Sequence, residues 1–272
     1  MKFGICTGPE NAVVIEDAGF DYIELNVVGN LRPFEPDDTV MPQLEQLLAM
    51  SGLRSEAMNG MVPGDLPLVG SPDRLDLERQ RQYLTSAFAR AKRVGCEVVV
   101  FGSGVARNVP EGFSKSAAEI QIVSFLAVAG DIAGEHNIDI AIEPLNRVEC
   151  NIINSVSEGA EIAARVNHPR VKVLSDLYHV GREEQSYDET ANAGSTLAHV
   201  HVARPSDRFV PVPEDEPMLI DYFKAVRRAG YSGRISIEAG WPSGIETSAG
   251  DVLKVLQEAW RLSDSKSETA VR

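Results

Sequence analysis

The chain has 272 residues, of which 43% are hydrophobic and 24% are charged, and its formal net charge is −14 at pH 7. This composition is typical of a globular protein with a substantial core, and the acidic balance argues against a nucleic-acid partner, because nucleic-acid binders need a basic face. No run approaches the roughly 20 apolar residues of a membrane span, and the N-terminus lacks a basic segment followed by an apolar signal core, so we expect a cytoplasmic protein without a membrane partner.

The first half of the chain alternates between short apolar runs and longer amphipathic segments. The short runs predict strands at residues 2–6, 21–25, 53–58 and 97–101. The amphipathic segments predict helices at residues 11–18, 40–50, 74–94 and 116–136. Long loops rich in glycine and proline are expected at 59–71 and 102–112.

The second half continues the same alternation. Its predicted strands are residues 138–143, 171–176, 197–203 and 234–238. Its predicted helices are residues 156–166, a segment within 183–195, 217–229 and 249–262. Eight strands that alternate with helices, without a linker-like segment between them, predict parallel strands and a single (β/α)₈ barrel over residues 1–262. A doubly wound sheet is the alternative, and the polar tail 263–272 is expected to be disordered.

Each of the four later strands ends on a side chain that can bind a metal ion. Glu143 precedes the strand-breaking Pro144, Asp176 ends the next strand, and His201 and Glu238 follow in the last two. A barrel brings successive strand ends together at its C-terminal rim, so these four residues are expected to form one site. Three carboxylates and one imidazole favour Mn²⁺ or Mg²⁺, with Co²⁺ as a further option, over zinc.

The histidines near this rim differ in their expected roles. His199 and His201 point to the same side of their strand, and His201 is nearer the rim, so His201 is the predicted ligand. His199 is expected to be an interior layer residue or a hydrogen-bond donor behind the site. His179 is expected on a loop three residues after Asp176, where it either donates to a substrate hydroxyl or lies on the surface.

These residues also carry a resemblance to a known family. The segments that carry it are EPLNRVE at 143–149, IIN at 152–154, SDLYH at 175–179, HVHVA at 199–203 and ISIE at 235–238. They resemble the xylose-isomerase-like barrel superfamily, and most closely its sugar isomerase/epimerase branch, which contains the D-tagatose and D-psicose 3-epimerases and the hydroxypyruvate isomerases. The match covers the second half of the chain, whereas the first half shares only the strand and helix rhythm.

The resemblance implies a metal-dependent sugar epimerase or isomerase. It implies that Glu143, Asp176, His201 and Glu238 bind one divalent cation, usually manganese, and that Glu143 and Glu238 also act as acid and base. A cation that chelates a hydroxy-ketone acidifies the proton on the neighbouring carbon by stabilising the enediolate. One carboxylate can then remove that proton and the other can return one, which epimerises or isomerises the sugar.

The same resemblance assigns the residues that hold the reactive end of a sugar or keto-sugar. It points to Glu149 and His179, and to an arginine soon after the metal-binding histidine, for which Arg208 is preferred to Arg204. Asn146 and Arg147 fit the family motif, but they fit equally well as structural groups of the barrel rim. Barrels of this branch often associate, so a homodimer or homotetramer is expected.

Two departures from the family pattern leave the substrate open. The loops at 103–113 and 209–216 differ from the usual ones and face the substrate side of a barrel. Arg107 and Lys115 either meet an anionic substrate group or are solvated loop charges. The alternative functions are a keto-sugar or keto-glycoside lyase or dehydratase with the same residues, and a non-catalytic sugar-binding barrel. An endonuclease-IV-like enzyme is disfavoured by five histidines and the net charge of −14.

Overall fold

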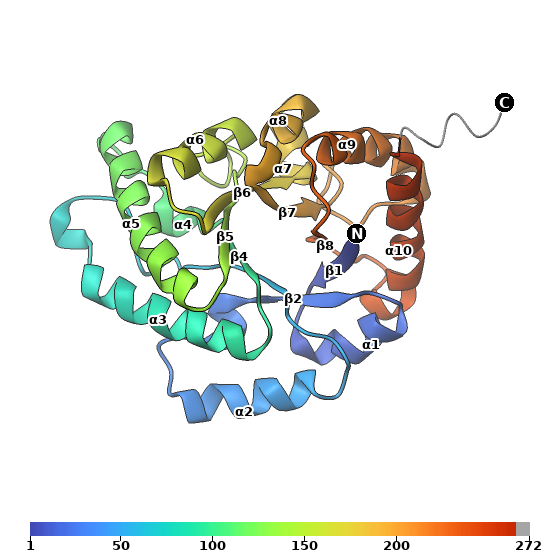
Figure 1. Cartoon of the computed structure of the whole chain (residues 1–272), viewed down its shortest axis with the longest axis horizontal. Helices are drawn as coiled ribbons and strands as arrows, with labels where there is room; N and C mark the ends of the chain where they lie inside the picture. The colour runs from blue at the N-terminus through green and yellow to red at the C-terminus, as the bar shows by residue number, and fades with distance from the viewer. Residues whose placement is uncertain (265–272) are drawn as a thin grey trace.

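The computed structural model describes residues 1–264 and contains one closed barrel, in which strands β1 to β8 pair in chain order and β8 pairs with β1 (Figure 1). All neighbouring strands are parallel, which confirms the predicted (β/α)₈ barrel and excludes a doubly wound sheet. The strands are β1 Lys2–Cys6, β2 Tyr22–Asn26, β3 Ala57–Asn59, β4 Val98–Phe101, β5 Asp139–Ile142, β6 Val171–Asp176, β7 Leu197–Val202 and β8 Arg234–Ile237.

Helices surround the barrel and connect its strands (Figure 1). They are α1 Ala12–Asp17, α2 Asp37–Leu48, α3 Leu77–Arg93, α4 Gly104–Arg107, α5 Lys115–Glu135, α6 Val156–Val166, α7 Leu177–Arg182, α8 Tyr187–Asn192, α9 Glu216–Arg228 and α10 Ile245–Leu262. Their buried faces and the outward-facing strand residues form the main hydrophobic core. A smaller core fills the barrel interior and consists of Tyr22, Ala57, Val98, Val100, Ala141 and Leu174.

Strand β3 is shorter than the predicted strand 53–58, and Ser55 explains the difference. The Ser55 hydroxyl is buried, accepts the backbone N–H of Leu25 at 3.3 Å and donates to the carbonyl of Ala57 at 3.0 Å. A side chain therefore replaces part of the backbone ladder before Ala57. The regular pairing begins only at Ala57, which lies opposite Glu24 of β2.

Two predicted loops contain short helices. Helix α4 lies within the predicted loop 102–112. Helix α7 begins directly after Asp176, whose Oδ1 accepts the backbone N–H of Tyr178 at 2.8 Å and so caps the helix. The expectation that His179 lies on a loop is therefore wrong, because His179 belongs to α7.

Helix α5 is long and apolar enough in composition to cross a membrane. In this fold it instead buries a stripe of residues that includes Ile122, Leu126 and Ala133, and it lies beside α3 and α6.

Near the C-terminus, Ser263 is buried and accepts a hydrogen bond from Arg227 at 2.8 Å. Ser263, the first residue of the predicted tail, therefore packs against α9, and residues 265–272 of that tail lie outside the described residues.

Candidate active site and metal centre

The four predicted metal ligands meet at the C-terminal end of the barrel. Glu143 and Glu238 directly follow β5 and β8, and their backbone N–H groups donate to carbonyls of the neighbouring strands β4 and β7 at 3.1 and 3.2 Å. Asp176 and His201 lie opposite each other in the register of β6 and β7. One ligand atom from each of the four residues lies within 4.8 Å of the other three.

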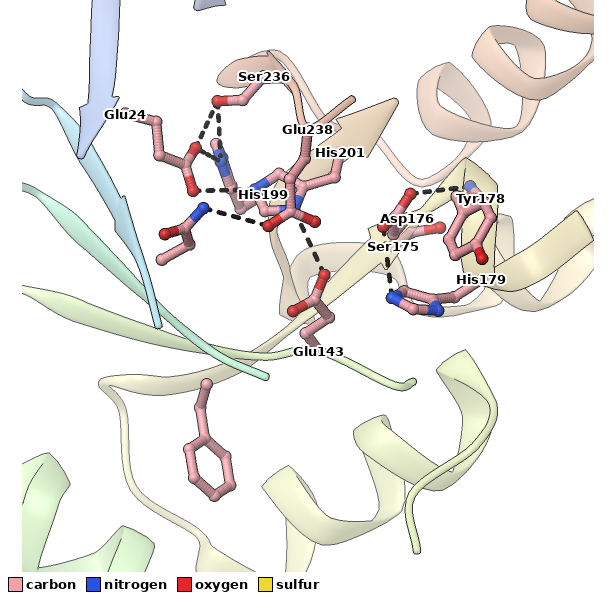
Figure 2. A network of polar contacts seen from close by, with 12 residues as sticks. Glu24, Glu143, Ser175, Asp176, Tyr178, His179, His199, His201, Ser236 and Glu238 are labelled. Carbon is pink, nitrogen blue, oxygen red and sulfur yellow. Dashed lines mark hydrogen bonds and ion pairs between the residues drawn. The ribbon is translucent and has the colours of Figure 1, made fainter. Parts of the chain in front are cut away.

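Three of these ligand atoms are buried without a hydrogen-bond partner in the described residues. They are Oε1 of Glu143, Oδ2 of Asp176 and Nδ1 of His201. His201 Nδ1 lies 3.3 Å from Glu143 Oε1 and 3.6 Å from Glu238 Oε2. Figure 2 shows these three side chains turned toward one another. Unpaired polar atoms are costly to bury, and a divalent cation among them would satisfy all three at once. The donor set therefore fits a metal ion.

The electrostatics of the carboxylates support the same interpretation. Burial, followed by the charge of Glu143, raises the pKa of Asp176 to about 8. Burial and the nearby Glu238 also raise the pKa of Glu143. Burial would raise the pKa of Glu238 too, but His201 and Arg208 lower it to about 2. Without a cation the three acids cannot all ionise easily, and a divalent cation would favour their charged forms.

Glu24 lies directly behind His201 and was not among the site residues predicted from the sequence. Its Oε1 lies 3.0 Å from His201 Nε2, and its Oε2 lies 2.8 Å from His199 Nε2 (Figure 2). Glu24 is completely enclosed in the barrel. The sequence does contain a pattern that predicts the inward orientation of Glu24. Ile23 and Leu25 are apolar and pack outward against the helices, so the strand period of two turns Glu24 toward the barrel interior.

His199 occupies the interior layer that the sequence predicted for it. It is fully buried and shares Glu24 with His201. Ser236 of β8 donates to the Oε2 of Glu24, and the Tyr22 hydroxyl lies 2.6 Å from the Ser236 hydroxyl. A polar network therefore supports the rim cluster from inside the barrel.

His179 faces the cluster from α7. Its Nε2 is buried without a partner in residues 1–264 and lies 3.7 Å from Asp176 Oδ2. Only 1% of its surface is exposed, so the alternative of a surface histidine is wrong. Burial and the positive charge of Arg208 lower the pKa of His179 to about 3, which keeps the ring neutral.

Arg208 connects two of the predicted site residues. It donates to Glu149 Oε1 at 3.1 Å and to Glu238 Oε2 at 2.8 Å, and its guanidinium lies 4.8 Å from the centre of the Tyr178 ring. Its φ of 58° places it in the left-handed region, which costs a non-glycine residue about 1–2 kcal/mol. Arg204 instead pairs with Asp207, so Arg208 is the arginine that reaches the cluster.

A cavity of about 390 Å³ opens beside Glu238. Its walls come from the ends of β1, β2, β3 and β8 and include Cys6 and three asparagines, Asn26, Asn30 and Asn59. Asn59 donates to Glu238 Oε1 at 3.1 Å and accepts from Asn26 at 2.9 Å. The first half of the chain therefore supplies much of the polar wall beside the cluster, although none of the first-half residues that line this wall was predicted to belong to the site.

Arg107 does not lie where it could meet a substrate. It is fully buried and donates to the carbonyls of Phe101 at 2.8 Å and Glu143 at 2.7 Å. The expected alternatives, an anion contact or a solvated loop charge, are both wrong for this residue, because it joins the ends of β4 and β5. Lys115, at the start of α5, is exposed.

Comparisons with known proteins find relatives of this barrel over most of the chain. A family model described as xylose isomerase-like TIM barrel matches residues 13–259. An L-ribulose 3-epimerase of Methylomonas sp. strain DH-1 is 25% identical over 258 residues, which cover 93% of this chain and 86% of that protein. A structure of D-psicose 3-epimerase with D-tagatose from Clostridium cellulolyticum H10 has a TM-score of 0.75 at 21% identity and covers 100% of both chains. A structure of IolI protein with a zinc atom has a TM-score of 0.67 at 18% identity and covers 98% of this chain and 99% of that one.

Proposed function

The chain belongs to the xylose isomerase-like TIM barrel family, and from this premise we propose that it is a divalent-metal-dependent sugar epimerase or isomerase. The Methylomonas relative is named as an L-ribulose 3-epimerase, and the Clostridium cellulolyticum structure is that of a D-psicose 3-epimerase. These names support a ketose or related keto-sugar as substrate. The chemistry proposed is proton transfer at a carbon next to the substrate carbonyl, with Glu143 and Glu238 as the transferring groups.

The observation that carries this proposal is the set of buried, unpaired ligand atoms at the barrel rim. Glu143, Asp176 and His201 each present one such atom to the same small volume, and Glu238 completes the set. Three carboxylates and one imidazole favour Mn²⁺, with Mg²⁺ and Co²⁺ as further options. A non-catalytic sugar-binding barrel would not need two glutamates beside the same cation.

A divalent cation bound here would polarise the substrate carbonyl and stabilise the negative charge that develops when the neighbouring proton leaves. Glu143 and Glu238 directly follow β5 and β8, and their carboxylates lie on different sides of the His201 ring (Figure 2). One can remove the proton and the other can return it to the opposite face of the carbon.

The neighbouring polar groups orient the substrate. His179 is neutral and turns Nε2 toward the cluster, where it can donate to a substrate oxygen. Arg208 and Glu149 form a pair that borders Glu238, so they contact whatever part of the sugar lies next to that glutamate. Association into a homodimer or homotetramer and a cytoplasmic location stay predictions from the sequence.

Deuterium exchange tests the proposed chemistry directly. The purified chain is stripped of metal, reloaded with Mn²⁺ and incubated in D₂O with a panel of ketoses and keto-glycosides. We expect deuterium at one carbon of an intact sugar, only when metal is present, and mass spectrometry with NMR identifies that carbon. Release of a fragment would instead support a lyase, and a panel without exchange in any sugar would contradict proton transfer on these substrates.

A further inference from the structure

Asn146 lies in the loop after β5, and only 2% of its surface is exposed. Its Oδ1 accepts the backbone N–H groups of Val148 at 3.1 Å and Glu149 at 3.3 Å. Backbone N–H groups can only donate, so these two bonds determine which end of the amide is the oxygen. The Nδ2 end must therefore point the other way, toward His179 and the Glu149 carboxylate.

Two donors from Asn146 converge on one ring nitrogen of His179. The backbone N–H of Asn146 lies 3.1 Å from His179 Nδ1, and the side-chain Nδ2 lies 3.0 Å from the same atom. Both groups carry hydrogen, so Nδ1 must accept and cannot itself be protonated. The hydrogen of the neutral ring is consequently on Nε2, which is buried 3.7 Å from Asp176 Oδ2 and has no partner in the described chain.

The same side chain also holds Glu149. Its Nδ2 donates to Glu149 Oε1 at 2.8 Å, and that oxygen also accepts from Arg208 at 3.1 Å. A single buried amide therefore contacts both His179 and Glu149, the two residues expected to border the reactive end of the sugar. If Asn146 only stabilised the barrel rim, its hydrogen-bond donors would not need to point at both His179 and Glu149.

We propose that Asn146 is a positioning residue that fixes His179 with its hydrogen on Nε2, as a donor toward the substrate, and holds the Glu149 carboxylate in place. Its contact with substrate is indirect, since it acts through these two side chains. The part that concerns the substrate rests on the proposed function, whereas the position of the hydrogen on His179 is a property of the protein alone.

The position of that hydrogen can be measured by NMR. The full chain is labelled with ¹⁵N-histidine, and long-range ¹H–¹⁵N correlations are recorded at neutral pH without added metal and with diamagnetic Mg²⁺. The His179→Gln variant assigns the signal among the five histidines. We expect the hydrogen of His179 on Nε2 in the unmodified protein, and a hydrogen on Nδ1 would overturn the proposal without any further variant.

Asn146→Asp tests whether the side chain is responsible. The variant keeps the size, the Oδ1 acceptor and the backbone N–H, but it replaces the Nδ2 donor by a carboxylate oxygen that can accept from the ring, so we expect His179 to gain a hydrogen on Nδ1. Asn151→Asp is the matched control, because Asn151 lies farther along the same segment and bonds Val109 instead of His179. An unchanged His179 signal in folded Asn146→Asp would show that the backbone N–H suffices and would refute the role of the side chain.

Kinetics connect the hydrogen position to the substrate. Once an exchanging sugar is known, we expect Asn146→Asp to raise its KM by about tenfold or more, the equivalent of one lost hydrogen bond, while the Kd for Mn²⁺ stays within about twofold. A KM unchanged from that of the parent protein would overturn the positioning role. If no sugar in the panel exchanges, the proposed function fails, and the NMR result still decides the role of Asn146 at His179.

Discussion

Inside the barrel, Nε2 of His201 lies 3.0 Å from Oε1 of Glu24, and this contact determines which ring nitrogen faces the carboxylate cluster. Burial opposes ionisation of Glu24, but His201 and His199 hold its pKa well below the usual range, so the carboxylate is charged and can only accept. Nε2 of His201 therefore carries a hydrogen, and Nδ1, which faces Glu143 and Glu238, is the nitrogen that can give its lone pair to a cation when it loses its own hydrogen.

Glu24→Gln should weaken metal binding without removing any ligand. The amide can donate to the ring as well as accept from it, so the orientation and basicity of His201 are no longer fixed. Loss of such a partner behind a metal ligand typically weakens binding by about 10–100-fold, and we expect an increase in the Kd for Mn²⁺ in that range. Isothermal titration calorimetry on the metal-free chain measures it.

A matched control for this variant is available at the other end of the barrel. Glu56 pairs with Lys2 and Arg234, whose strand positions lie at the N-terminal ends of β1 and β8. Glu56→Gln should leave the Kd for Mn²⁺ unchanged. Equal affinities of Glu24→Gln and the parent protein would mean that Glu24 is only a packing group.

Glu238→Gln should keep the metal but lose turnover. The amide retains an oxygen that can bind the cation, and it cannot accept the substrate proton. Loss of a general base typically costs about 10²–10⁴-fold in rate, so we expect kcat to fall in that range while the Kd for Mn²⁺ changes much less. Near-parental kcat in metal-loaded Glu238→Gln would remove Glu238 from the proton-transfer pair.

The sequence predicted the barrel because its signals are local. Each strand is a short apolar run, and the alternation of strands and helices leaves few topologies. The metal cluster could be predicted from the sequence for a related reason. Glu143, Asp176, His201 and Glu238 all lie at strand ends, and strand ends meet at one rim in any parallel barrel.

The missed residues depend on contacts between distant strands. Glu24 contacts His201 across 177 residues of sequence, and Asn59 contacts Glu238 across 179. No local pattern in the first half marks these pairs, because one polar residue in an apolar strand is compatible with many partners. Arg107 was misjudged for the opposite reason, since a charged residue in a glycine-rich segment resembles a solvated loop charge until its burial is known.

Arg107→Met should destabilise the protein. The guanidinium donates two hydrogen bonds to the carbonyls of Phe101 and Glu143, and methionine would leave both carbonyls buried without these donors. A lost hydrogen bond to a charged group costs about 1.5–3 kcal/mol, so we expect the free energy of unfolding to fall by about 3 kcal/mol. Urea denaturation of the metal-free chain measures this change.

Arg182→Met provides the comparison for Arg107, because Arg182 is an exposed arginine at the end of α7. Exposed substitutions of this kind usually change the free energy of unfolding by less than about 0.5 kcal/mol. Similar urea midpoints for the two variants would show that the contacts of Arg107 do not stabilise the ends of β4 and β5.

Asp176 links the stability of the metal-free protein to pH. Burial, followed by Glu143, raises its pKa to about 8, whereas an unfolded chain has a value near 4 for this group. The folded state therefore holds a proton that the unfolded state lacks, and stability falls as pH rises toward 8. Burial lowers the pKa of His201, but Glu24 and the other nearby acids raise it well above its usual value, which acts in the same direction.

The metal-free protein should consequently lose stability between pH 6.5 and 8.5, and bound Mn²⁺ should remove most of that loss. His179 acts in the opposite direction, because burial lowers its pKa to about 3, but its effect is complete above the unfolded value near 6.5. Between pH 6.5 and the Asp176 pKa of about 8, the free energy of unfolding should therefore fall by roughly 2 kcal/mol. This loss corresponds to about 5 °C in Tm for a chain of this size. Calorimetry under nitrogen with and without Mn²⁺ measures the difference, and a metal-induced rise in Tm that stays constant across this interval would show that Asp176 is already ionised in the metal-free site.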